Sequence, residues 1–93
     1  MPTIHLLIKG KVQGVFYRAT AKKIADKFNL TGWIKNTKDD DVEAIITGDE
    51  DKLQEFINWC KKGPEKAYVE EVIVTKLKDI MFTNFEIIRG QRS

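Results

Sequence analysis

The chain has 93 residues, which suffices for one domain and leaves no room for a second. Its 16 basic and 14 acidic residues are interleaved and leave a net charge of +2, so composition gives little support to a nucleic-acid or membrane partner. The apolar run at the start is too short for a signal peptide, no segment approaches the roughly 20 apolar residues of a membrane span, and a lone cysteine fits a reducing compartment, so we expect a single cytoplasmic domain over residues 1–93.

The first half of the chain contains strand and helix patterns in alternation. Residues 3–11 alternate apolar and polar side chains, which predicts a strand with one apolar face. In residues 18–28 apolar side chains recur at helical spacing, which predicts an amphipathic helix. Two short segments, residues 32–37 and 41–48, are separated by three polar residues, a spacing typical of a hairpin.

The second half predicts another helix and two more strands. Residues 49–62 begin with acidic and end with basic side chains, which complement the helix dipole, and Gly63 and Pro64 end the helix. Residues 67–78 and 84–89 are predicted strands. Two helices with one apolar stripe each must share one face of the sheet, so we expect an α+β ferredoxin-like sandwich, βαββαβ plus a short C-terminal strand, with a mainly antiparallel sheet.

A loop from Gly10 to Arg18 joins the first strand to the first helix. Unpaired backbone N–H groups point outward at a helix start, and anions bind well there. Gly14 can adopt the backbone angles that turn successive N–H groups into a concave nest, and Arg18 adds a planar charged fork that matches phosphate oxygens. Short glycine loops are common, however, so residue types alone leave a purely structural turn open.

The loop closely resembles the signature of the acylphosphatase family, a glycine-x-valine-glutamine-glycine-valine run with an arginine three residues on. The matching residues are Gly10, Val12, Gln13, Gly14, Val15 and Arg18. Residues 32–36, Gly-Trp-Ile-Lys-Asn, resemble a second signature of that family. The two motifs occur in the family's order, and the resemblance extends over essentially the whole chain, which is similar to small single-domain acylphosphatases of the common type.

This resemblance implies an enzyme that hydrolyses the carboxyl-phosphate bond of an acyl phosphate by water attack. Arg18 would bind the phosphate and Asn36 would orient the water. The implied phosphate-binding residues are Val12, Gln13, Gly14, Val15, Phe16, Tyr17 and Arg18. We expect inorganic phosphate to be product and competitive inhibitor, and we expect a monomer with no metal, cofactor, nucleic-acid or membrane partner.

The residue chemistry agrees with this reaction. The leaving group is a carboxylate whose conjugate acid has a pKa of about 4, so it departs without a strong general acid. Phosphoryl transfer depends mostly on positioning and on stabilising charge on the equatorial oxygens. The side-chain amide of Asn36 is neutral, but it can accept one hydrogen bond from water and donate another.

Three residues depart from the family pattern. Tyr17 stands where phenylalanine or methionine is usual, Ile34 where a smaller apolar residue is usual, and Asp40 where a glycine is expected in the hairpin turn. Aspartate visits the left-handed region more readily than most residues, so Asp40 is tolerable there. We expect these changes to affect the rate of turnover more than the type of reaction.

Other residues with reactive side chains receive structural interpretations. Cys60 is followed by a spacing like that of a cysteine phosphatase loop, but it ends a helix on the apolar stripe, so we expect buried packing. His5 is expected to be a structural side chain of the first strand. Asp39, Asp40 and Asp41 lack the alternate spacing of a calcium loop, so we expect a solvated turn.

A non-catalytic ferredoxin-like module that binds an anion or RNA is the alternative function. Its RNA-binding form is disfavoured because the predicted strands lack the aromatic-rich motif of RNA-recognition domains. The sequence defines no pocket for the acyl group, so it does not identify the physiological acyl phosphate.

Overall fold

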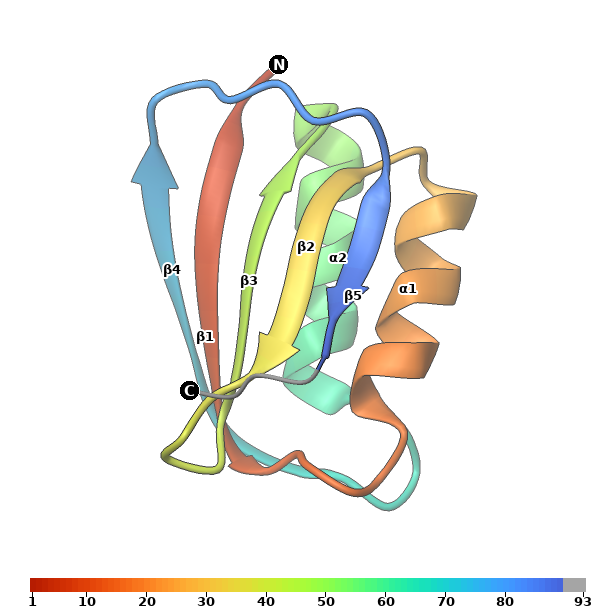
Figure 1. The fold of residues 1–93 in the computed structure, drawn as a ribbon, viewed down its shortest axis with the longest axis vertical. Helices are drawn as coiled ribbons and strands as arrows, with labels where there is room; N and C mark the ends of the chain where they lie inside the picture. The colour runs from red at the N-terminus through yellow and green to blue at the C-terminus, as the bar shows by residue number, and fades with distance from the viewer. Residues whose placement is uncertain (90–93) are drawn as a thin grey trace.

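The computed structural model describes residues 1–89 of the chain (Figure 1). Its elements are β1 (Thr3–Lys11), α1 (Tyr17–Lys27), β2 (Thr31–Asn36), β3 (Val42–Thr47), α2 (Glu50–Lys62), β4 (Tyr68–Leu77) and β5 (Phe85–Ile88). Their order matches the predicted β-α-β-β-α-β-β sequence, and every predicted element is present. No helix within this part of the chain is long and apolar enough to cross a membrane.

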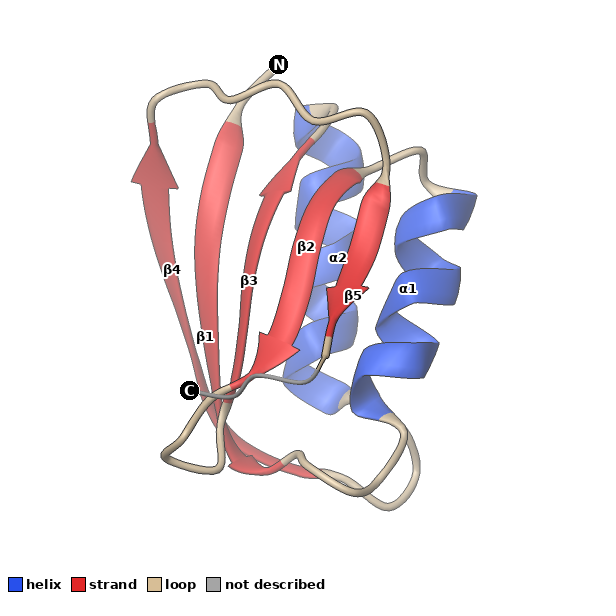
Figure 2. Cartoon of the chain, in the orientation of Figure 1, coloured by secondary structure: helices blue, strands red, loops and turns tan. Residues whose placement is uncertain are grey.

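The strands form one five-stranded sheet in the order β4-β1-β3-β2-β5. All neighbours pair antiparallel except β2 and β5, which run parallel. Figure 2 shows both helices on the same side of this sheet, so no element within residues 1–89 covers the other side. The predicted ferredoxin-like α+β sandwich, with a short final strand, is confirmed.

The apolar core lies between the sheet and the two helices. Alternation along β1 sends Leu6 and Ile8 into this layer, where both are fully buried. The helices contribute side chains of contrasting size: α1 buries the small Ala21 and Ala25, whereas α2 buries the large Phe56. Burying this apolar surface is the main force that holds the layers together.

A segment between β4 and β5 crosses one end of the sheet and sets the direction of β5 (Figure 1). The hydroxyl of Thr47 donates to the carbonyl oxygen of Ile80 at 2.8 Å, and the Ile80 amide donates to the hydroxyl of Thr3 at 2.9 Å. Because β5 then runs parallel to β2, the carboxyl ends of both strands lie at the same edge of the sheet. The loop that leads into α1 lies at this edge as well (Figure 1).

The turn between β2 and β3 corrects one expectation. Asp40 has the left-handed φ of 70° that makes an aspartate tolerable there. The expected solvated turn is wrong for Asp41, which is 7% exposed. The carboxylate of Asp41 accepts a hydrogen bond from Lys9 Nζ at 2.9 Å, and this charge partner makes its burial possible.

Candidate active site

The loop between β1 and α1 presents a row of unpaired backbone donors. Buried side chains of Val12 and Val15 hold the loop against the core, while Gly14 and Phe16 adopt φ values of 73° and 64°. No described residue accepts a hydrogen bond from the N–H groups of residues 13–19. Left-handed residues within such a loop turn its N–H groups inward, and the helix dipole adds positive potential, a geometry that is typical of anion-binding nests.

Arg18 lies in the first turn of α1 and lines a cavity of about 310 Å³ beside this loop. The lining consists of Val12, Gly14, Phe16, Tyr17, Arg18, Ala19, Asn36, Ile87 and Arg89. Partial burial, and secondarily the positive charge of Arg89, lowers the pKa of Arg18 from its usual value. A guanidinium nevertheless stays charged in proteins, so Arg18 brings a permanent cation and a planar set of donors to the cavity.

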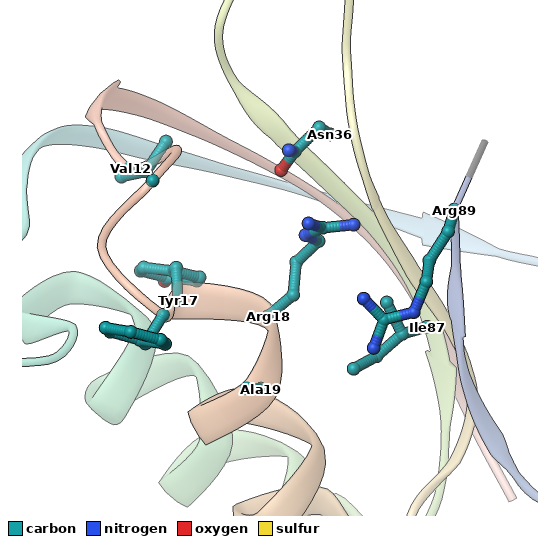
Figure 3. A pocket seen from close by; sticks show the side chains of 9 residues that line it. Val12, Tyr17, Arg18, Ala19, Asn36, Ile87 and Arg89 are labelled. Atoms are coloured by element: carbon teal, nitrogen blue, oxygen red, sulfur yellow. The ribbon is translucent and has the colours of Figure 1, made fainter. Parts of the chain in front are cut away.

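Asn36 ends β2 and points to the same cavity. Ile34, two residues earlier, is buried in the core, so alternation puts the side chain of Asn36 on the face that the helices cover. Its Oδ1 atom is buried and receives no hydrogen bond from any described residue. Figure 3 shows the guanidinium of Arg18 directed toward the Asn36 side chain. An unpaired acceptor thus lies beside a cation and a row of unpaired donors.

The side chain of Gln13 ties the loop to the hairpin turn that follows Asn36. Its Nε2 atom donates to the carbonyl oxygen of Thr37 at 3.0 Å and to that of Asp41 at 2.8 Å. The Thr37 hydroxyl accepts the amide N–H of Asp41 at 3.1 Å, which closes the turn. The nest and Asn36 are therefore held in a fixed relation by side-chain contacts as well as by the sheet.

Tyr17 anchors the start of α1 in the core. The side chain is 1% exposed, and its hydroxyl donates to the carbonyl oxygen of Cys60 at 2.8 Å. That carbonyl belongs to the last turn of α2, where the helix itself offers no partner. Burial raises the pKa of Tyr17 above its ordinary range, so the ring stays neutral. The hydroxyl that departs from the family pattern thus joins the ends of two helices.

Comparison with known proteins identifies the family. The sequence model of the acylphosphatase family matches residues 4–87, which is most of the chain. The chain belongs to the acylphosphatase family.

Relatives with this name come from distant organisms. The chain is 44% identical over 82 residues to an acylphosphatase of Marinobacter nauticus, covering 87% of this chain and 89% of that protein. It is 49% identical over 71 residues to an acylphosphatase of Pyrobaculum islandicum, covering 75% of each. The crystal structure of acylphosphatase from Bacillus subtilis superimposes with a TM-score of 0.92 at 33% identity, covering 96% of this chain and 100% of that one.

The residues of the acylphosphatase signatures fall into two groups in the structure. Arg18, Asn36 and the loop backbone meet at one cavity. The side chains of Val12, Val15 and Tyr17 lie in the core. The side chain of Gln13 is bound to the hairpin turn. These four residues can therefore contact an anion only through their backbone groups.

Cys60 and His5 take structural positions, as expected. Cys60 is fully buried, and burial raises the pKa of its thiol to about 12, so it is not a thiolate nucleophile at neutral pH. His5 Nε2 lies 2.8 Å from a carboxylate oxygen of Glu43. The side chains of His5 and Glu43 lie on the open face of the sheet, opposite the helices and the cavity.

Sequence reasoning missed three residues that line the cavity, Ala19, Ile87 and Arg89. Ala19 follows Arg18 directly within the helix predicted over residues 18–28, and nothing in its residue type marks it as part of a site. Ile87 and Arg89 are two residues apart, so they share a face of the strand predicted over residues 84–89, and this spacing was the available signal. It has meaning for the site only once β5 is known to lie parallel beside β2.

Proposed function

We propose that the chain hydrolyses acyl phosphates with Arg18 and the loop amides holding the phosphoryl group and Asn36 orienting the attacking water. The observation that carries this proposal is the convergence of three groups on one cavity: the unpaired N–H groups of residues 13–19, the guanidinium of Arg18 and the unpaired Oδ1 of Asn36. Family membership supports the reaction, and the geometry supports the assignment of roles.

The phosphoryl group is the natural ligand of the nest. Its equatorial oxygens carry most of the charge that develops during transfer, and fixed donors aimed at them lower the barrier because they need no reorganisation. Backbone N–H groups are fixed by the loop, and Arg18 is fixed at the helix start. Bidentate contacts from the guanidinium would also set the orientation of the phosphoryl group for attack.

Asn36 is the group best placed to orient water. A buried carbonyl oxygen without a partner costs about 1–3 kcal/mol, which a water molecule donating to it would offset. The same water can then approach phosphorus from the side opposite the acyl oxygen. Asn36 is neutral and takes no proton, so its contribution is alignment.

The bond changes balance without a protein acid or base. The water oxygen forms the new bond to phosphorus, and the bond from phosphorus to the acyl oxygen breaks with its electron pair remaining on the carboxylate. The proton of the attacking water passes to a phosphate oxygen. The products are a carboxylate and inorganic phosphate, which would occupy the nest and inhibit competitively. Every group in the proposed mechanism comes from one chain, which supports action as a monomer.

The open face of the sheet does not favour the alternative RNA-binding module. Register pairs Glu71 with Lys9, Glu43 with Lys35 and Glu86 with Trp33 on that face. Carboxylates spread across three strands repel a phosphate backbone, so the mixed charge of this face works against a salt-dependent nucleic-acid contact.

Hydrolysis of benzoyl phosphate by the intact chain and by Arg18→Ala tests the proposal. Loss of one fixed donor set removes about 3 kcal/mol or more of transition-state stabilisation, so kcat/KM should fall by at least about a hundredfold. Arg18→Lys should also fall markedly, because a single ammonium cannot replace the planar fork.

The matched control is Lys23→Ala, which removes an exposed cation from the same helix outside the cavity lining. It should keep the activity of the intact chain. Circular dichroism confirms that each variant is folded. A folded Arg18→Ala protein that turns over benzoyl phosphate like the intact chain would show the proposed role to be wrong.

A further inference from the structure

Arg89 occupies a defined place at the edge of the sheet. The parallel pairing of β2 and β5 sets Ile34 opposite Ile87 and Lys35 opposite Ile88. Asn36 follows Lys35 at the end of β2 and Arg89 follows Ile88 just past the end of β5, so the two residues lie at the same edge of the sheet. Arg89 therefore follows Phe85 and Ile87 on the helix-covered face, and it lines the cavity that holds Arg18 and Asn36.

The two arginines enter the cavity from different sides. Figure 3 shows the guanidinium of Arg18 directed toward Asn36, whereas the side chain of Arg89 bends toward the side where Ile87 is seen. Arg18 begins α1 and so lies with the nest, and Arg89 lies past the end of β5. The phosphoryl group already has the nest and Arg18, so the Arg89 cation lies on the side left for the rest of the substrate.

Apolar groups line the cavity together with these cations. They are the side chains of Phe16, Ala19 and Ile87. Phe16 is 81% exposed although it is a large aromatic residue, and its left-handed φ of 64° holds it at the start of α1. An exposed aromatic ring and two aliphatic groups offer contact to a short carbon chain.

The charges around the cavity are positive at both arginines. Among residues 1–89, no carboxylate lies within 4.0 Å of either guanidinium in an ion pair. Two cations that face one cavity repel each other, and an anion bound between or beside them offsets this repulsion. The phosphoryl group would neutralise the charge of Arg18, and a second anion would neutralise that of Arg89.

We propose that Arg89 binds a second anionic group at the far end of the acyl chain, so that the preferred substrates are monoacyl phosphates of short dicarboxylic acids. This inference rests on the hydrolysis proposed above. Phe16, Ala19 and Ile87 contact the intervening methylene groups, and the terminal carboxylate pairs with the guanidinium of Arg89.

The test compares substrates that differ only in the terminal charge. Succinyl phosphate and glutaryl phosphate are each measured against their terminal methyl esters. The intact chain should show a kcat/KM at least about tenfold higher for the acid than for the ester in one or both pairs, the size expected of a charged hydrogen bond. In Arg89→Gln this preference should fall to within about threefold.

Two controls separate recognition from general charge effects. Lys23→Gln removes one positive charge from the exposed side of α1 and should retain the preference of the intact chain. The inhibition constant of inorganic phosphate, measured with acetyl phosphate as substrate, should change less than about threefold in Arg89→Gln, since phosphate alone occupies the nest.

The possible failures are distinguishable. If the intact chain hydrolyses neither acetyl phosphate nor these substrates, the proposed function itself is wrong. If it hydrolyses them with no preference for the acid in either pair, or if Arg89→Gln keeps that preference, the role of Arg89 is wrong. A rise of about tenfold or more in the inhibition constant of phosphate would overturn the proposal by making Arg89 a ligand of the phosphoryl group.

Discussion

The side chain of Asn36 lowers the stability of the fold locally and has a proposed role in the reaction. Its Oδ1 atom is buried without a partner among residues 1–89, while the rest of the hairpin is well bonded through Thr37 and Asp41. Buried acceptors of this kind are rare in folded proteins because they lose hydration without compensation. Such a cost is usual at active sites, where polar groups are arranged for a ligand.

Substituting Asn36 should therefore separate activity from stability. In Asn36→Ala, kcat should fall by about a hundredfold because the attacking water loses its orientation. The free energy of unfolding should not decrease, because the unpaired oxygen is removed as well. Steady-state kinetics and urea unfolding measure the two effects.

The comparison variant is Asn58→Ala, which alters an exposed asparagine of α2. It should leave kcat as in the intact chain. A large loss of stability in Asn36→Ala with normal kcat would show that Asn36 has only a structural role.

At the scale of elements, the link between the loop and the β2–β3 turn governs the site. The loop follows β1 and Asn36 ends β2, two strands that are joined only through β3, so a direct contact between the loop and the turn adds to what the sheet fixes. The amide of Gln13 makes this contact with two hydrogen bonds. We therefore infer that Gln13 is a positioning residue whose side chain acts through Asn36.

Gln13→Ala should lower kcat about tenfold while the inhibition constant of phosphate changes less than about twofold, because the loop amides remain. In a double-mutant cycle, the substitution should have little further effect in an Asn36→Ala background, since both changes remove the same alignment. An unchanged kcat with weaker phosphate inhibition would instead place the Gln13 side chain on the phosphate.

Element positions follow from the sequence because they depend on neighbouring residues. Alternation and helical spacing predicted a helix over residues 18–28, and α1 spans Tyr17–Lys27. Burial of Asp41 could not be predicted in this way, since it depends on Lys9, which lies 32 residues away. The signatures predicted the cavity positions of Arg18 and Asn36, but Arg89 joins them only through the parallel pairing of β2 and β5.

At the scale of the whole molecule, the pKa of the Cys60 thiol depends on the packing of the helices against the sheet. It is fully buried in α2 against the sheet. Burial raises the pKa of its thiol from 9.0 to about 12. A folded state that retains a proton longer than the unfolded state loses stability as the pH rises between these two values.

Alkaline pH should therefore destabilise the intact chain more than Cys60→Ala. Between pH 8 and pH 10.5 the thiol should contribute a loss of about 2 kcal/mol in the free energy of unfolding, and the variant should lack this part. Urea unfolding at the two pH values measures the difference. An equal change in the free energy of unfolding with pH for both proteins would contradict the burial of the thiol. Rapid reaction of the native chain with a thiol reagent at pH 8 would contradict it as well.

The meeting of loop, β2 and β5 at one sheet edge also links ligand concentration to the folding equilibrium. These segments lie far apart in an unfolded chain, so the proposed phosphate site exists only in the folded state. A ligand at a hundred times its dissociation constant then adds about 2.7 kcal/mol to the free energy of unfolding. Calorimetry should show this increase with phosphate for the intact chain and a much smaller one for Arg18→Ala. Phosphate should therefore shift the folding equilibrium toward the folded chain, independently of any hydrolysis.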